Sequence, residues 1–169
     1  LKLVALITSA AEGVGICGGA GSDQQTATAY HEAGHAIIAE VEGLEPQFVE
    51  FFREPKNGVR GRLVLDGPRP GDLENLRAHA TTACGGALGT LLYAGARVAD
   101  LGSFADDGYK LAKAGEAMSG PRNSELRWPF QVEAARRAAD IIVKLAAAVS
   151  ALAGELLKFA PVDRAGIQA

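Results

Sequence analysis

Two histidines and a glutamate fall within five consecutive residues of this chain, in the pattern HExxH. His31 and His35 are four residues apart, so on an α-helix they lie one turn apart on the same face and both imidazoles can reach one metal ion. Zinc accepts imidazole nitrogen, and three protein ligands with one open position are typical of a catalytic zinc site. Glu32 is the residue type that takes a proton from a zinc-activated water as that water attacks a carbonyl. The pattern therefore predicts a hydrolytic zinc site.

The same five residues have two alternative explanations. One is chance spacing on a solvated helix, and the other is a metal site without catalysis. The neighbouring residues disfavour the first. Ala29 and the apolar run 36–39 surround the motif, which predicts a helix that is buried on much of its circumference. Burying two imidazoles and a carboxylate without a partner would be costly, and a bound metal removes that cost.

A third protein ligand is required, and the extended pattern HExxHxxGxxH does not supply it, because Val41 stands at the position of its third histidine. His79 and Cys84, in the second predicted helix, are candidates. Asp106 and Asp107 are better placed, at the start of the third predicted helix, although carboxylates at a helix N-terminus are also common caps. Spacing alone leaves these alternatives open.

Helix caps and apolar periodicity place the elements that must position these residues. A first helix is expected from an N-cap at Asp23 or Thr26 to about Val41, and it carries the HExxH motif. Alternating apolar and polar residues on both sides of Asn57-Gly58 predict a β-hairpin. The other expected elements are a helix capped by Asp72 and extending to about Tyr93, a helix from Ala105 or Asp106 to just before Ser119, one long helix or two abutting helices over residues 130–158, and a final turn capped by Asp163.

The first twenty-odd residues are apolar and glycine-rich, and we expect a short strand or loop followed by a flexible connector. The chain is then divided into an N-terminal segment or connector over residues 1–23 and one domain over residues 24–169. The expected fold class is α+β, mostly α, with one small β-hairpin.

Composition and charge exclude several classes of protein. The 169 residues fit a single domain, and 48% hydrophobic with 22% charged residues argue against a disordered chain. A net charge of −3 excludes a broadly basic nucleic-acid binder. No apolar run reaches the roughly 18 residues that a membrane helix needs.

The cysteine content favours a reducing compartment. Cys17 and Cys84 have no CxxC spacing and give no sign of a disulfide framework, so we expect a cytoplasmic protein. The chain begins with Leu rather than Met, and its apolar start resembles a signal peptide only faintly. We therefore expect a fragment rather than a secreted precursor.

Four stretches of the chain carry a likeness to a known family: TATAYHEAGHAIIAEVEG, ACGGALGTLLYAG, GSFADDGYKLAKAGEAM and ALAGELLKFAPVDRAGI. In that order they resemble the zinc-binding helix, the glycine-pair helix, the segment with the aspartate zinc ligand, and the closing helix with its Asp-centred turn. The family is FtsH, the ATP-dependent zinc metalloproteases, and the resemblance is to its peptidase domain. It covers about residues 24–167 and implies a zinc-peptidase-like domain over 24–169.

The resemblance implies that His31, His35 and Asp107 hold Zn²⁺ and that Glu32 is the general base. Two departures concern the family's assembly into rings: Ala87 stands where the family has Arg, and residues 89–91 replace an acidic pair. The sequence contains no GxxxxGK[ST] loop, so we expect that this chain does not unfold substrates by itself.

Together these observations predict a zinc metalloendopeptidase that hydrolyses peptide bonds with a zinc-activated water and Glu32 as general base. The alternative is a non-catalytic zinc-binding helical module that binds a protein partner. The expected substrate is a peptide or unfolded protein, with no nucleic acid and no membrane segment in this chain. A homo-oligomer and a separate ATPase partner are both compatible with the sequence.

Overall fold

The structure is a computed structural model that describes residues 2–15, 23–54, 58–69, 71–95, 105–120 and 123–169. It is mostly helical with a small antiparallel sheet, which confirms the predicted fold class. Within the described ranges, no helix is both long enough and apolar enough to cross a membrane. In chain order the elements are α1 (Lys2–Gly13), α2 (Gln24–Val41), β1 (Phe48–Glu54), β2 (Gly58–Val64), α3 (Leu73–Ala94), α4 (Ala105–Ser119), the 3-10 turn η3 (Ser124–Leu126), α5 (Arg127–Lys144), α6 (Ala146–Leu156), β3 (Val162–Asp163) and α7 (Arg164–Gln168).

Three aspartates cap helices where the sequence predicts them. The carboxylate of Asp23 accepts the main-chain N–H of Thr26 at 2.7 Å, at the start of α2. Asp72 does the same for α3, and Asp163 for α7. Each cap satisfies a main-chain donor that the first turn of a helix leaves unpaired. The start of the HExxH helix is therefore set by local chemistry.

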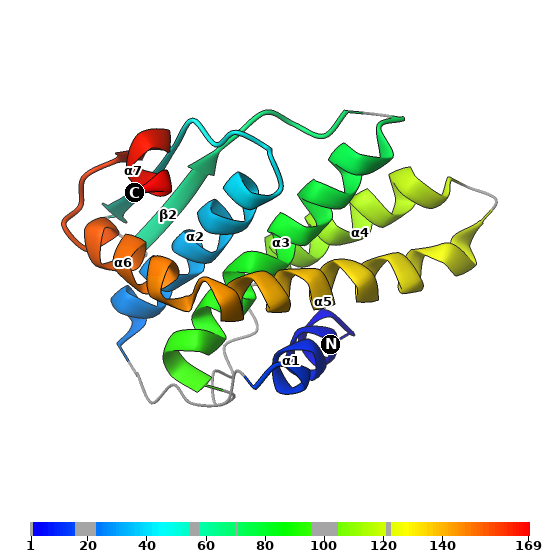
Figure 1. Cartoon of the computed structure of the whole chain (residues 1–169), viewed down its shortest axis with the longest axis horizontal. Coiled ribbons are helices and arrows are strands. Elements are labelled where there is room, and N and C mark those ends of the chain that lie inside the picture. Colours follow the sequence, from blue (N-terminus) through cyan, green and yellow to red (C-terminus); the bar gives the residue numbers. More distant parts are fainter. Residues whose placement is uncertain (1, 16–22, 55–57, 70, 96–104, 121–122) are drawn as a thin grey trace.

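Helices α2 and α3 form the centre of the molecule (Figure 1). Helix α3 packs against α2, α4 and α5, while the other sides of α2 meet α6 and the sheet. Residues 80–91 of α3 are all buried, and they are rich in Ala, Gly and Thr. A helix that is buried all round belongs to the interior of a protein, and small side chains let its neighbours come close.

Glycines permit a direct backbone contact between α2 and α3. A Cβ atom placed on Gly34 would overlap the carbonyl oxygen of Gly85 and lie 3.2 Å from the Cα of Gly89. A Cβ on Gly89 would overlap the carbonyl oxygen of Tyr30. The two backbones can approach this closely because the residues at these contact points have no side chains.

The sheet has the strand order β2-β1-β3 and is antiparallel throughout. In the predicted hairpin Phe51 pairs with Gly61 and Glu54 with Gly58, whereas the turn residues 55–57 lie outside the described residues. Alternation places Val59, Gly61 and Leu63 on the face of β2 that packs towards the core. On this face of β2, two apolar side chains therefore flank Gly61, which has none.

Three parts of the chain differ from the sequence-based expectation. Residues 2–13 form helix α1 rather than a strand or loop, because Leu6, Ile7, Ala10 and Ala11 recur at helical spacing and are buried in the core beside α3 and α5. The two-residue strand β3 extends the hairpin to three strands. Of the two options for residues 130–158, the structure has two helices, with a break at Leu145.

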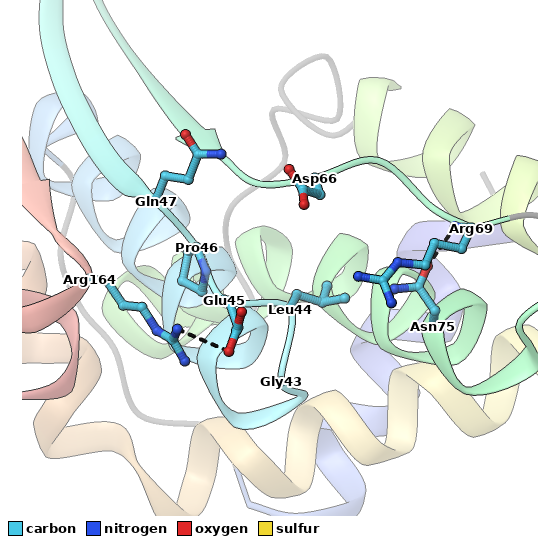
Figure 2. A pocket seen from close by; sticks show the side chains of 9 residues that line it. All are labelled: Gly43, Leu44, Glu45, Pro46, Gln47, Asp66, Arg69, Asn75 and Arg164. Carbon is cyan, nitrogen blue, oxygen red and sulfur yellow. Dashed lines mark hydrogen bonds and ion pairs between the residues drawn. The ribbon is translucent and has the colours of Figure 1, made fainter.

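Ion pairs fasten the C-terminal helix to the end of α2. Arg164 at the start of α7 donates to Glu40 at 3.0 Å and pairs with Glu45 at 3.2 Å, while Gln168 donates to Glu40 at 2.6 Å. Arg164 and Glu45 also line a cavity of about 370 Å³ together with Arg69 and other residues (Figure 2). Of the charged groups on its wall, Arg164 and Glu45 pair with one another.

The close contact of α2 and α3 makes Gly34 sensitive to substitution. Gly34→Ala should lower the free energy of unfolding by about 1–3 kcal/mol, because the new methyl group would overlap the main chain of α3. Gly154→Ala is the matched control, since nothing lies within 4 Å of a Cβ at that exposed position of α6. The control should stabilise the protein by up to about 1 kcal/mol, as alanine favours helix. Denaturant unfolding of both variants measures the difference, and a stabilised Gly34→Ala would contradict the backbone contact.

Candidate metal centre

Helix α2 presents both histidines to α3 and α4. The His35 side chain is buried and that of His31 is partly buried, with the two rings edge to face and their centroids 4.7 Å apart. Their Nε2 atoms are 3.1 Å apart. The i, i+4 spacing therefore brings two imidazole nitrogens to one point.

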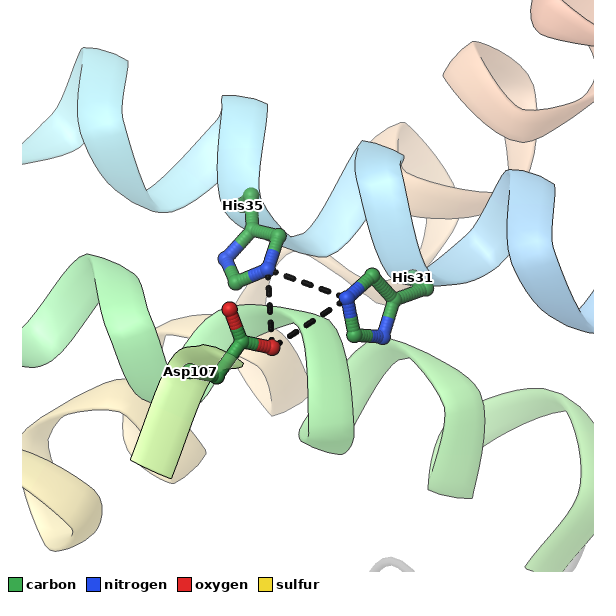
Figure 3. Close-up of side chains that lie close together, drawn as sticks. All are labelled: His31, His35 and Asp107. Atoms are coloured by element: carbon green, nitrogen blue, oxygen red, sulfur yellow. Dashed lines mark hydrogen bonds and ion pairs between the residues drawn. The ribbon is translucent and has the colours of Figure 1, made fainter. Parts of the chain in front are cut away.

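Asp107 reaches the same point from the first turn of α4. Its Oδ2 atom lies 3.2 Å from each of the two Nε2 atoms (Figure 3), and the residue is only 3% exposed. His31, His35 and Asp107 thus form a group of three side chains that could hold a metal ion. Two nitrogens and a carboxylate oxygen are ordinary ligands for a divalent transition metal.

Helix α3 orients both imidazole rings through contacts with their Nδ1 atoms. The Nδ1–H group of His35 donates to the carbonyl oxygen of Thr82 at 2.7 Å, and the main-chain nitrogen of Gly86 lies 3.2 Å from the same ring atom. The Thr90 hydroxyl donates to the carbonyl oxygen of Gly86 and lies 3.4 Å from Nδ1 of His31. With Nδ1 engaged in this way, the Nε2 lone pair of each ring is available to a metal.

Gly86 leaves the room that the two rings occupy. A Cβ at this position would overlap His31 Cε1 and His35 Nε2, and would lie 2.5 Å from His31 Nε2. Sequence reasoning singled out the pair Gly85-Gly86 only by family likeness. The two glycines make room for different groups, since Gly85 meets the backbone of α2 and Gly86 meets the two histidine rings.

The charges of the three side chains depend on one another. Burial lowers the pKa of the His35 imidazole, but the charge of Asp107 and its hydrogen bond to the ring, with help from Glu32, raise that pKa to about 9. Burial raises the pKa of the Asp107 carboxyl, but the two histidines outweigh burial and hold it well below its usual range. A buried carboxylate between two imidazoles therefore retains a cation, either a proton or a metal ion.

Lys110 approaches the centre from the surface. Its amine lies 3.5 Å from Oδ1 of Asp107, the oxygen that does not face the histidines, and the lysine side chain itself is exposed. Solvent weakens such a pair, so we ascribe little of the energy of the site to it.

The other candidate ligands lie apart from this group. Asp106 is exposed, at the next position around α4. The His79 ring hydrogen-bonds to the main chain at Gly67, and its Nε2 atom is buried without a partner among the described residues. Cys84 is fully buried, which raises the pKa of its thiol, and it is not one of the three converging residues.

Glu32 lies beside the centre on the side of α2 that faces strand β2. The residue is 8% exposed. Within the described part of the chain, no hydrogen bond or ion pair engages its carboxylate, although the charge of that group acts on the His35 ring. A carboxylate next to a cation-binding group can accept a proton.

Comparison with known proteins adds no assignment to this geometry. No protein-family model matches the chain, and no curated protein has a matching sequence.

The adjacent aspartates should differ in their effect on metal binding. Asp107→Ala should weaken the binding of Co²⁺, used as a spectroscopic probe, by about 100-fold or more, because it removes one of three converging donor atoms. Asp106→Ala is the matched control and should leave the affinity nearly unchanged. Optical titration measures both. Equal losses in the two variants, or a larger loss in Asp106→Ala, would contradict the position of Asp107.

Metal binding should also release protons. In the metal-free protein the pKa of His35 is about 9, so its ring is protonated at pH 7.5 and must lose that proton to bind a metal ion. The apparent affinity should therefore rise with pH up to about 9. Calorimetric titration at pH 7.5 in two buffers with different ionisation enthalpies measures the number of protons released, which we expect to be close to one. A heat of binding that is the same in both buffers would contradict this.

Proposed function

We propose that this chain is a zinc-dependent metallopeptidase that hydrolyses peptide bonds, with Glu32 as the general base. One observation carries the proposal: three donor atoms converge next to Glu32, whose charge acts on the ring of one of the three residues, His35. The ligands proposed are His31, His35 and Asp107. This set leaves one position of a four-coordinate metal open to a reactant, which distinguishes catalytic from structural zinc sites.

The chemistry of the donor atoms supports zinc over hard cations, and their spacing is compatible with zinc. Bonds from zinc to nitrogen and oxygen are about 2.0–2.2 Å, so the ligand atoms of a regular tetrahedron are roughly 3.3–3.6 Å apart. The three separations here are 3.1, 3.2 and 3.2 Å, close to that value. Magnesium and calcium prefer six or more oxygen ligands, whereas two of these donors are imidazole nitrogens.

A bound zinc ion would polarise the carbonyl group of the substrate and make an attacking water more acidic. The chain itself supplies the other parts of the reaction. Glu32 would accept the proton of the attacking water and pass it to the leaving amine. The hydrogen bonds from α3 would hold the two imidazoles in place while the charge on the reacting atoms changes, so that little reorganisation is needed.

The choice of a peptide as substrate comes from the resemblance to the FtsH peptidase domain, which extends from the HExxH helix to the closing turn. A peptide or unfolded protein is the proposed substrate class, and the cytoplasm is the proposed location. The alternative, a zinc-binding module that recognises a protein partner, uses the same three ligands but has no need of Glu32.

Glu32→Gln separates the two functions. The amide cannot take up a proton, so the variant should keep its metal and its fold but lose at least about 100-fold in the rate of peptide hydrolysis. Glu116→Gln, at an exposed position of α4, is the matched control and should retain full activity. Cleavage of an unstructured peptide library, together with metal analysis of each purified variant, measures the effect.

Hydrolysis by Glu32→Gln at the wild-type rate would show that another group serves as the base. A metal-loaded wild-type protein that cleaves no peptide in the library would favour the binding module instead.

A further inference from the structure

Strand β2 presents a notch to helix α2. Val59 and Leu63 are partly buried and pack against the core, and Gly61 lies between them on the same face of the strand. The side chain of Glu32 occupies the space that Gly61 leaves free. A Cβ on Gly61 would overlap Cγ of Glu32 and lie 2.5 Å from Cδ and 2.8 Å from Oε1. The strand and the glutamate therefore fit together only because residue 61 has no side chain.

Close packing against β2 encloses the Glu32 side chain. No hydrogen bond or ion pair to it exists among the described residues. The residue is nevertheless 8% exposed, so its side chain is enclosed between α2 and β2. Phe51, paired with Gly61 on β1, is 2% exposed, so the strand next to the notch is also packed in the core. The position of the carboxylate thus depends on the shape of this notch.

We propose that Gly61 is a positioning residue for the general base: the notch in β2 sets where the Glu32 carboxylate lies. For its kinetic part this inference rests on the function proposed above. A side chain at residue 61 would push the carboxylate along α2 or out of the space between helix and strand. A displacement of about 1 Å in a catalytic group can cost about 100-fold in rate.

The notch and the proposed metal ligands make their contacts with different neighbours of α2, which makes the two separable by mutation. His31 and His35 contact groups of α3 and α4, whereas Glu32 contacts β2. Gly61→Ala should therefore keep the full metal content while kcat falls by about 100-fold with little change in KM. Gly67→Ala is the matched control, because nothing lies within 4 Å of a Cβ at that position just beyond the strand.

A thermal-stability comparison tests the contact without any assay of activity. Gly61→Ala should lower Tm by about 3–10 °C, as expected when a core contact is overpacked. In a Glu32→Ala background, which has no Cγ to overlap, the same substitution should cost much less. If Gly61→Ala alone does not fold, the double variant should still fold, because the overlap is gone.

Three outcomes would overturn the inference: an equal fall in Tm in both backgrounds, a double variant that fails to fold when Glu32→Ala folds, or an unchanged kcat in a metal-loaded Gly61→Ala protein. A wild-type protein without peptidase activity overturns the proposed function and the kinetic part with it. In that case the Tm comparison still decides whether Gly61 makes room for Glu32.

Discussion

The backbone contact between α2 and α3 is the constraint on which the rest of this structure depends. Gly34, Gly85 and Gly89 have no side chains, so at these positions the two helices meet main chain to main chain. Only at this distance can a carbonyl oxygen of α3 reach a ring nitrogen of His35 at 2.7 Å. A helix crossing with ordinary side chains would place the axes about 8–10 Å apart and move these groups out of reach.

The same glycine-rich surface explains how a charged group can lie in the interior. Asp107 is almost fully buried, and an isolated carboxylate in such a place would be strongly unfavourable. The two imidazoles offset that cost by sharing a cation with it. They can do so because α3 supplies their second hydrogen bonds from main-chain and threonine oxygens rather than from further charges. The polar centre is thus satisfied by elements that are otherwise apolar.

The part of the fold that the sequence predicts is the part governed by local chemistry. Asp23, Asp72 and Asp163 cap helices as expected, and the HExxH spacing by itself brings the two Nε2 atoms together. The N-terminal helix was wrongly expected to be a strand or loop, because the glycines that follow it obscured the helical spacing of Leu6, Ile7, Ala10 and Ala11. Strand β3 pairs with a strand more than a hundred residues earlier, and two residues carry no periodicity.

Sequence patterns alone could not decide whether Asp106 or Asp107 joins the two histidines, and the reason is geometric. Neighbouring residues on a helix point about 100° apart, so the choice between Asp106 and Asp107 depends on how α4 is rotated against α3. That rotation is fixed by the burial of Leu111 and Ala114 in the core, which is a tertiary contact. The role of Gly61 is equally non-local, since it requires knowing that Glu32 and β2 meet.

The three converging side chains come from two distant parts of the chain, and this has a consequence for the conformational entropy of the chain. His35 and Asp107 are separated by 72 positions, and a metal ion bound by both would close the intervening chain into a loop. Closing a loop of this length removes conformational entropy from the unfolded chain worth about 4 kcal/mol when the link is a disulfide. A metal ion at this position would be a reversible crosslink, present in the folded chain and absent once the three side chains separate, so that the free energy of unfolding would rise with the concentration of free metal.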